Sequence, residues 1–202
     1  MFDTFRNAWK IPELRKKILF TLMILVIFRL GCAISVPYVN VDALELFRQL
    51  GGSGNMLDYL NMMSGGALSQ CAIFALSVSP YINASIIIQL LTVAIPALER
   101  LSKEGEEGRR KLTRITRYTG AGIGVAMSIG YYMVLRSWGV LTYNTGWQAV
   151  FSAVVIVLSF AAGSQLLTWM GEQIDDKGIG NGVSLLIFVG IISRWSSLIN
   201  SV

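Results

Sequence analysis

The sequence contains no histidine, and only 14% of its 202 residues are charged, compared with about a quarter in soluble proteins. Without histidine, histidine-based catalysis and most zinc sites are excluded. The two cysteines, Cys32 and Cys71, lie in apolar stretches, where we expect buried small hydrophobic side chains, although the sequence leaves a disulfide open. Hydrophobic residues make up 53% and the mean hydropathy is +0.58. This composition indicates a membrane protein, and no cofactor is expected.

The first 38 residues predict a surface segment followed by a spanning helix. Residues 1–17 are basic and amphipathic, which is typical of a segment at the membrane interface. Residues 18–38 are long enough to span, and no small-residue cleavage site ends them, so we do not expect a cleavable signal peptide. Arg29 lies inside this helix. It is either a functional residue or a side chain that reaches the polar interface.

Residues 64–99 contain a glycine pair, an apolar run and Pro80 within that run. Polar groups inside a membrane need protein or water partners, so a broken, polar helix favours a position beside a pore. A proline-kinked helix packed among others explains the pattern equally well. Before it, residues 56–63 predict a short re-entrant helix or an ordinary interfacial helix. The small polar residues of the run are Ser77, Ser79, Asn83, Ser85 and Gln89.

Residues 99–117 carry seven basic and four acidic side chains. We expect a solvated loop, interrupted at Gly105 and Gly108, that signals topology. A docking surface for a cytosolic partner is the functional alternative.

Three further spanning helices are predicted, at 118–135, 148–170 and 183–200. The first has a stripe of small residues for close helix packing, namely Gly120, Gly124, Ala126 and Ser128. The second has a weak point at Gly163-Ser164. Trp138, Tyr143 and Trp147 between them are typical membrane-interface anchors. The glycine-rich loop 171–182 lacks the pattern of a phosphate-binding loop.

Basic residues predict the orientation. With the N-terminus inside, thirteen of the seventeen lysines and arginines lie inside and three outside, and Arg29 lies within the first helix. This bias favours a cytosolic N-terminus and an outer C-terminus.

Four long motifs resemble segments of the SecY family, whose members form the channel subunit of the bacterial protein translocon. They are MSGGALSQ, SPYINASIIIQLL, EGEEGRRKLTRITRY and GEQIDDKGIGNGVSLLIF, and FRLG in the first helix resembles the family as well. The resemblance runs in order over nearly all of the chain and is weakest at 39–56 and 136–150.

The resemblance implies an all-α, polytopic protein of the bacterial plasma membrane that is not an enzyme. It implies five transmembrane helices and a short re-entrant plug helix, which together form one half of an inverted-repeat channel. Residues 1–17 would be cytosolic, and 18–202 would form the half-channel, with a plug at 56–66 and cytosolic loops at 99–117 and 171–182. The family carries unfolded polypeptides across the membrane and releases apolar segments into lipid through a lateral gate.

The resemblance also assigns site residues and partners. The implied partners are SecE-like and SecG-like small membrane subunits, a SecA-type ATPase motor, the ribosome, signal peptides, nascent chains and membrane lipids. The pore ring would include Val78, Ile82, Ile86, Val183 and Ile187. The plug would consist of Met56, Leu57, Asp58, Tyr59, Leu60, Asn61, Met62, Met63, Ser64, Gly65 and Gly66. Asn83 and Gln89 would lie at the lateral gate. Arg100, Lys103, Arg109, Arg110, Lys111 and Lys177 would dock the motor or ribosome.

Such a half-channel lacks the other half of the pore ring. Either a C-terminal half or an antiparallel second copy would supply it, and the strong charge bias argues against the second copy in cells. Two other functions remain open: half of an inverted-repeat small-solute transporter, and a structural membrane scaffold.

Overall fold

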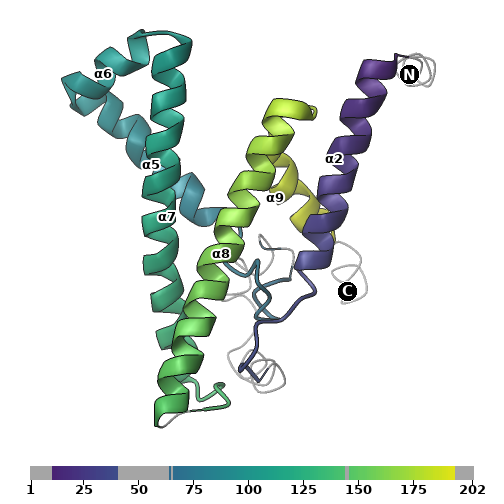
Figure 1. Cartoon of the computed structure of the whole chain (residues 1–202), viewed down its shortest axis with the longest axis vertical. Coiled ribbons are helices and arrows are strands. Elements are labelled where there is room, and N and C mark those ends of the chain that lie inside the picture. The colour runs from purple at the N-terminus through teal and green to yellow at the C-terminus, as the bar shows by residue number, and fades with distance from the viewer. Residues whose placement is uncertain (1–10, 41–63, 65, 144–145, 194–202) are drawn as a thin grey trace, which may run out of the picture.

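The computed structural model describes residues 11–40, 64, 66–143 and 146–193. These residues form helices and irregular segments, and two isolated bridges, Ser35–Ala72 and Val39–Leu141, are the extended pairings among them. Figure 1 shows α7 and α8 as the two long helices, with α5 beside α7 and both α2 and α9 beside α8. The helices are α2 (Pro12–Gly31), α5 (Ser79–Ala94), α6 (Pro96–Lys103), α7 (Glu106–Ser137), α8 (Trp147–Lys177) and α9 (Gly182–Ser193).

Two of the described helices, α7 and α8, are each long and apolar enough to cross a membrane. A third candidate is the pair α5 and α6, whose axes differ by 102°. The bend lies at Ile95, whose backbone is extended (φ −111°, ψ 114°). Pro96 explains it, because a proline disfavours helical geometry in the preceding residue and donates no backbone hydrogen bond.

The first predicted span is wrong at both ends. Helix α2 begins at Pro12 and ends at Gly31, and residues 32–40 form an irregular segment. A Cβ at Gly31 would collide with the ring of Phe74, so the glycine admits this ring against the last turn of α2. Beyond the helix, the Val36 N–H donates to Cys71 O at 2.9 Å and the Ile73 N–H donates to Ile34 O at 3.0 Å. These bonds replace helical ones, and Pro37 disfavours a helical Val36.

The run before α5 is interrupted, as predicted, but the interruption is much longer than a proline kink. The segment 66–78 consists of turns, and φ is positive at Cys71 (43°) and Ser77 (52°). It is nevertheless buried, with Ala67, Cys71 and Ala72 all at 0% exposure. Its apolar side chains therefore stabilise it through packing, in place of helical hydrogen bonds. We call residues 66–78 the unwound segment.

Close approach to α8 fixes the position of the unwound segment. A Cβ at Gly163 would collide with the backbone carbonyl of Ile73. The predicted weak point at Gly163-Ser164 is therefore wrong: α8 continues unbroken, and the glycine admits the neighbouring backbone. Both cysteines are free and buried, which confirms the expectation of small hydrophobic side chains.

The charged residues 99–117 are mostly helical, contrary to the predicted loop. They form α6 and the first turns of α7, joined by Glu104 and Gly105, where φ is 77° at Gly105. Gly105 thus separates the helices as expected, but Gly108 lies within α7. A Cβ at Gly108 would collide with Leu101 O, so this glycine allows α6 to fold back closely on α7. We call residues 96–117 the basic hairpin (Figure 1).

The predicted loop 171–182 is also mostly helical, since α8 runs to Lys177 and only residues 178–181 connect it to α9. Side chains hold this short turn. The Gly182 N–H donates to Asp175 Oδ1 at 2.7 Å, and the Ile179 N–H donates to Thr21 Oγ1 on α2 at 3.2 Å. The turn is thus tied to both α8 and α2.

The small-residue stripe of α7 packs as predicted at three of its four positions. Gly120, Gly124 and Ser128 are buried, whereas Ala126 is exposed on another face. A Cβ at Gly120 would lie 3.5 Å from Ala84, and one at Gly124 would lie 3.0 Å from Ser164 Oγ. The stripe therefore brings α7 close to both α5 and α8.

Candidate pore and gate residues

One apolar cluster joins the unwound segment to α2, α8 and α9. It contains residues of α2, the unwound segment, α8 and α9, and Phe28 stacks on Phe74 with ring centroids 6.0 Å apart. We call it the central cluster. Its buried members are Ile24, Phe28, Cys32, Ala67, Ala72, Phe74, Val78, Leu167, Met170, Ile174 and Leu186.

The structure brings two of the five expected ring residues to the central cluster. Val78, at 1% exposure, belongs to it, and Val183 of α9 packs against it. Val78 directly precedes α5, so the unwound segment determines where this side chain lies. Ile82 and Ile187 are half-buried, and Ile86 is 50% exposed. The expected ring residues on and directly before α5 thus run from the buried Val78 to the exposed Ile86.

The expected gate residues lie on the uncovered part of α5. Asn83 and Gln89 are exposed, and Gln89 Nε2 donates to Ser85 Oγ one turn away at 3.3 Å. Thr92 Oγ1 donates to Gln89 O at 2.6 Å. Exposed apolar side chains share the helix with these polar ones, namely Ile86, Ile87, Leu90 and Val93. This mixed face has no covering helix within the described residues.

Five of the six expected docking residues lie on the basic hairpin. Arg100, Lys103, Arg109, Arg110 and Lys111 are all exposed. Acidic neighbours accompany them: Lys103 Nζ lies 2.6 Å from Glu99 Oε1, and Lys111 Nζ lies 3.7 Å from Glu104 Oε2. Exposed pairs of this kind contribute at most about 1 kcal/mol, so the hairpin keeps its charges available to a partner. Lys177, at the end of α8, is exposed as well.

Of the expected plug, only Ser64 and Gly66 are described; 56–63 and Gly65 lie outside the described residues. Ser64 is buried, and its carbonyl accepts a weak bond from Cys32 Sγ at 3.9 Å. Its hydroxyl accepts the Leu68 N–H at 3.2 Å. Ser64 thus anchors the start of the described segment beside the end of α2.

Arg29 is at the end of its helix, in the last turn of α2. Its Nη1 donates to Ser193 Oγ, at the end of α9, at 3.0 Å. The side chain is exposed and links α2 to α9. Both interpretations of Arg29, a functional residue or a side chain that reaches the polar interface, stay predictions.

Two polar contacts had no signal in the sequence. Arg117 Nη1 of α7 lies 3.4 Å from Glu172 Oε2 of α8, while Glu172 Oε1 is buried without a hydrogen bond. The hydroxyl of the half-buried Tyr131 donates to Leu68 O at 3.3 Å and lies 3.8 Å from Cys71 Sγ. Both contacts join residues more than fifty positions apart in the sequence, so no local spacing pattern predicts them.

Within the described ranges, no group of three or more His, Cys, Asp or Glu side chains is placed to hold a metal ion. The site consists of an apolar cluster, an interrupted helix beside it and a basic hairpin at the end of α5. These features define a helical membrane protein whose central feature is apolar packing around an unwound segment.

Comparison with known proteins gives the family: the chain belongs to the SecY family, whose sequence model matches residues 72–202. It is 44% identical over 206 residues to the protein translocase subunit SecY of Streptomyces coelicolor, an alignment that covers 98% of this chain and 47% of that protein. It is 41% identical over 208 residues to SecY of Thermotoga maritima (98% and 47%) and 43% identical over 203 residues to SecY of Bacillus subtilis (96% and 44%). The chain therefore spans about half the length of these relatives.

The fold is similar to that of solved channels. A structure described as a protein conducting channel matches with a TM-score of 0.60 at 18% identity, over 89% of this chain and 36% of that one. Sec61 in the canine ribosome-channel complex from the endoplasmic reticulum matches equally well, with the same TM-score, identity and coverage. At this identity the likeness shows the fold alone.

Proposed function

We propose that this chain forms the first half of a protein-conducting channel, which moves unfolded polypeptides across the bacterial plasma membrane and releases apolar segments sideways into lipid. One observation carries the proposal. The unwound segment brings Val78 to the same apolar cluster that Val183 packs against, so the interrupted helix and α9 contribute branched aliphatic side chains to one place. A ring of such side chains makes a narrow constriction that excludes water and ions.

In this proposal the five helices that cross the membrane are α2, α5, α7, α8 and α9, and α6 belongs to the cytosolic basic hairpin. The plug is residues 56–66, and the gate face is the uncovered side of α5 with Asn83 and Gln89. In Figure 1 the start of α2 and the end of α8 lie toward the end of the molecule that carries the basic hairpin, and the basic residues of these two parts are Arg15, Lys16, Lys17 and Lys177. That distribution supports a cytosolic N-terminus and an outer C-terminus.

The partners are proposed from chemistry and from the relatives. The exposed bases of the hairpin and Lys177 suit an acidic or RNA-containing surface, such as a ribosome or a SecA-type motor. One solved channel of this fold is described in a complex with a ribosome. SecE-like and SecG-like subunits would cover part of the remaining lipid-facing surface.

The second half of the pore comes, in this proposal, from a C-terminal half like that of the relatives. The uncovered face of α5 would pack against it. Polar contacts between membrane helices average only about 0.6 kcal/mol, so Asn83 and Gln89 would allow this contact to open when an apolar segment arrives.

Reconstitution tests the proposal. This chain is combined in vesicles with the C-terminal half of the Bacillus subtilis relative, and import of an unfolded precursor is measured as protease protection in the presence of a SecA-type ATPase and ATP. We expect import from the combined halves and none from either half alone. Assembly of the two halves without import would contradict the proposal.

A further inference from the structure

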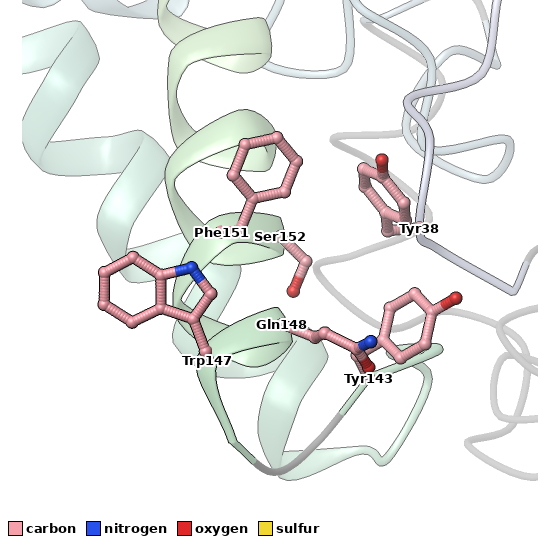
Figure 2. A pocket seen from close by; sticks show the side chains of 6 residues that line it. All are labelled: Tyr38, Tyr143, Trp147, Gln148, Phe151 and Ser152. Carbon is pink, nitrogen blue, oxygen red and sulfur yellow. The ribbon is translucent and has the colours of Figure 1, made fainter.

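A pocket of about 290 Å³ lies at the start of α8, and none of its lining residues belongs to the central cluster. Figure 2 shows four aromatic side chains around it, contributed by the segment after α2, the loop after α7 and the first turns of α8. Tyr38 lies 6.0 Å from Tyr143 and 6.4 Å from Phe151 between ring centroids, and the rings are tilted or edge-on. The lining residues are Tyr38, Tyr143, Trp147, Gln148, Phe151 and Ser152.

The backbone places Tyr38 in this pocket at a conformational cost. Its φ is 69°, a region that non-glycine residues rarely adopt. Two hydrogen bonds hold it there, because both the N–H and the Oγ1 of Thr142 donate to Tyr38 O at 3.1 Å. The pairing of Val39 with Leu141 continues this contact. Two segments about a hundred residues apart are therefore joined so that their tyrosines face the same space.

Among the described residues, the lining contains aromatic faces and neutral polar groups but no charged side chain. Aromatic faces attract organic ammonium groups, and they do so without a carboxylate. Gln148 and the Ser152 hydroxyl add neutral polar atoms, and Figure 2 shows the indole nitrogen on the edge of Trp147 nearer to Ser152. Because no basic residue is among the described residues that line the pocket, this lining does not suit a purely anionic headgroup.

An exposed apolar stripe continues from the pocket along α8. Trp147, Phe151, Val154 and Leu158 follow a helical spacing and are 85%, 58%, 52% and 61% exposed. At 1.5 Å per residue they cover about 16 Å, close to half of the roughly 30 Å hydrocarbon core of a bilayer. A stripe of one leaflet's depth that begins at a polar, aromatic pocket matches the shape of a phospholipid.

We propose that the pocket binds the amine-bearing headgroup of a zwitterionic phospholipid such as phosphatidylethanolamine, whose acyl chain lies along the stripe of α8. The ammonium lies among the rings of Tyr38, Tyr143 and Trp147, and the headgroup oxygens accept hydrogen bonds from the indole and amide N–H groups. This inference requires only that α8 crosses the membrane. It is independent of polypeptide transport, so either proposal can fail alone.

Native mass spectrometry of the full chain, released from nanodiscs of equimolar phosphatidylethanolamine and phosphatidylglycerol, tests the inference by counting retained lipids. We expect selective retention of phosphatidylethanolamine. The double variant Tyr143→Leu/Trp147→Leu removes two aromatic faces and should lower this retention about tenfold. The matched control is Trp169→Leu, which removes an exposed tryptophan from the same helix outside the pocket and should leave retention unchanged.

A conservative variant separates loss of binding from loss of fold. Tyr143→Phe/Trp147→Phe keeps both aromatic faces and should retain most of the lipid. A phosphatidylethanolamine with a photoreactive acyl chain should label the peptide that contains Val154 and Leu158. Equal retention of both lipids by the natural chain, unchanged retention in the leucine variant, or occupation of the pocket by a polypeptide amine in place of lipid would each overturn the proposal.

Discussion

The close contact between Gly163 and the unwound segment makes a quantitative prediction. In Gly163→Ala the new Cβ would lie 2.6 Å from Ile73 Cγ2 and 2.8 Å from the Ile73 carbonyl carbon, and would collide with the carbonyl oxygen. Carbon atoms pack best at about 3.5–4.0 Å, so α8 and the unwound segment must separate by about 1 Å. Because the neighbour is backbone, no side-chain rotation relieves the collision.

Two terms of opposite sign decide the size of the effect. Alanine is favoured over glycine within a helix by about 1 kcal/mol. Overpacking costs about 1–3 kcal/mol and occasionally more, and a backbone collision belongs at the upper end of that range. We therefore expect Gly163→Ala to lower the free energy of unfolding by about 2 kcal/mol.

Denaturation of the full chain in mixed micelles, followed by circular dichroism, measures this change. The matched controls are Gly122→Ala and Gly130→Ala on α7, where a Cβ would meet no atom within 4 Å. These should be neutral or more stable by up to about 1 kcal/mol. If Gly163→Ala behaved like the two controls, the unwound segment would not pack against α8 as described.

Three further predictions concern polar contacts and the pore. Arg117→Gln should lower the free energy of unfolding by about 1 kcal/mol in the same denaturation assay, because Glu172 keeps a partly buried carboxylate without its partner. Tyr131→Phe should cost about 1 kcal/mol, since the partly buried carbonyl of Leu68 loses its hydrogen-bond donor. Ile82→Gly should raise the resting ion conductance of the assembled channel in planar bilayers, because it widens the proposed apolar ring.

Each of these variants has a control elsewhere in the chain. Arg110→Gln removes an exposed partner of Glu106, at 3.9 Å, and should change stability by less than about 0.5 kcal/mol. Tyr132→Phe removes the hydroxyl of the neighbouring tyrosine and is the control for Tyr131→Phe. Ile87→Gly makes the same change as Ile82→Gly on another face of α5 and should leave the conductance low. If a variant had no larger effect on stability or conductance than its control, the role assigned to its contact would be wrong.

The sequence predicts the cores of α7 and α8 because long apolar runs with few charges have one stable structure in a membrane. It does not predict their full lengths. Residues 106–117 and 171–177 contain several charged side chains. Such side chains mark the end of the part of a helix that lies in the membrane, but the helix itself continues beyond it. Gly108 and Gly163 look like helix breakers in the sequence, yet both lie within helices and admit a neighbouring chain.

The unwound segment shows a different limit of sequence reasoning. Its alanine, leucine and serine residues are compatible with a helix, and only the position of Pro80 indicates an interruption. The backbone has positive φ at Cys71 and Ser77, and Cys71 packs against residues of α7 and α8 far away in the sequence, which no local pattern records. The mixed face of α5 could be predicted, because its polar residues are visible in the sequence. The burial of Val78 could not, because it depends on contacts with residues far away in the sequence.

The most direct test of the half-channel proposal is cysteine crosslinking between positions 82 and 187, on α5 and α9. Ile82→Cys and Ile187→Cys are introduced into a chain whose two buried native cysteines are replaced by alanine. The molecular mass of the crosslinked species is then determined. The proposal predicts a crosslink within one chain, which would place both helices around a common pore. Crosslinks only between two chains would indicate an antiparallel assembly, and the absence of any crosslink would contradict the assigned ring.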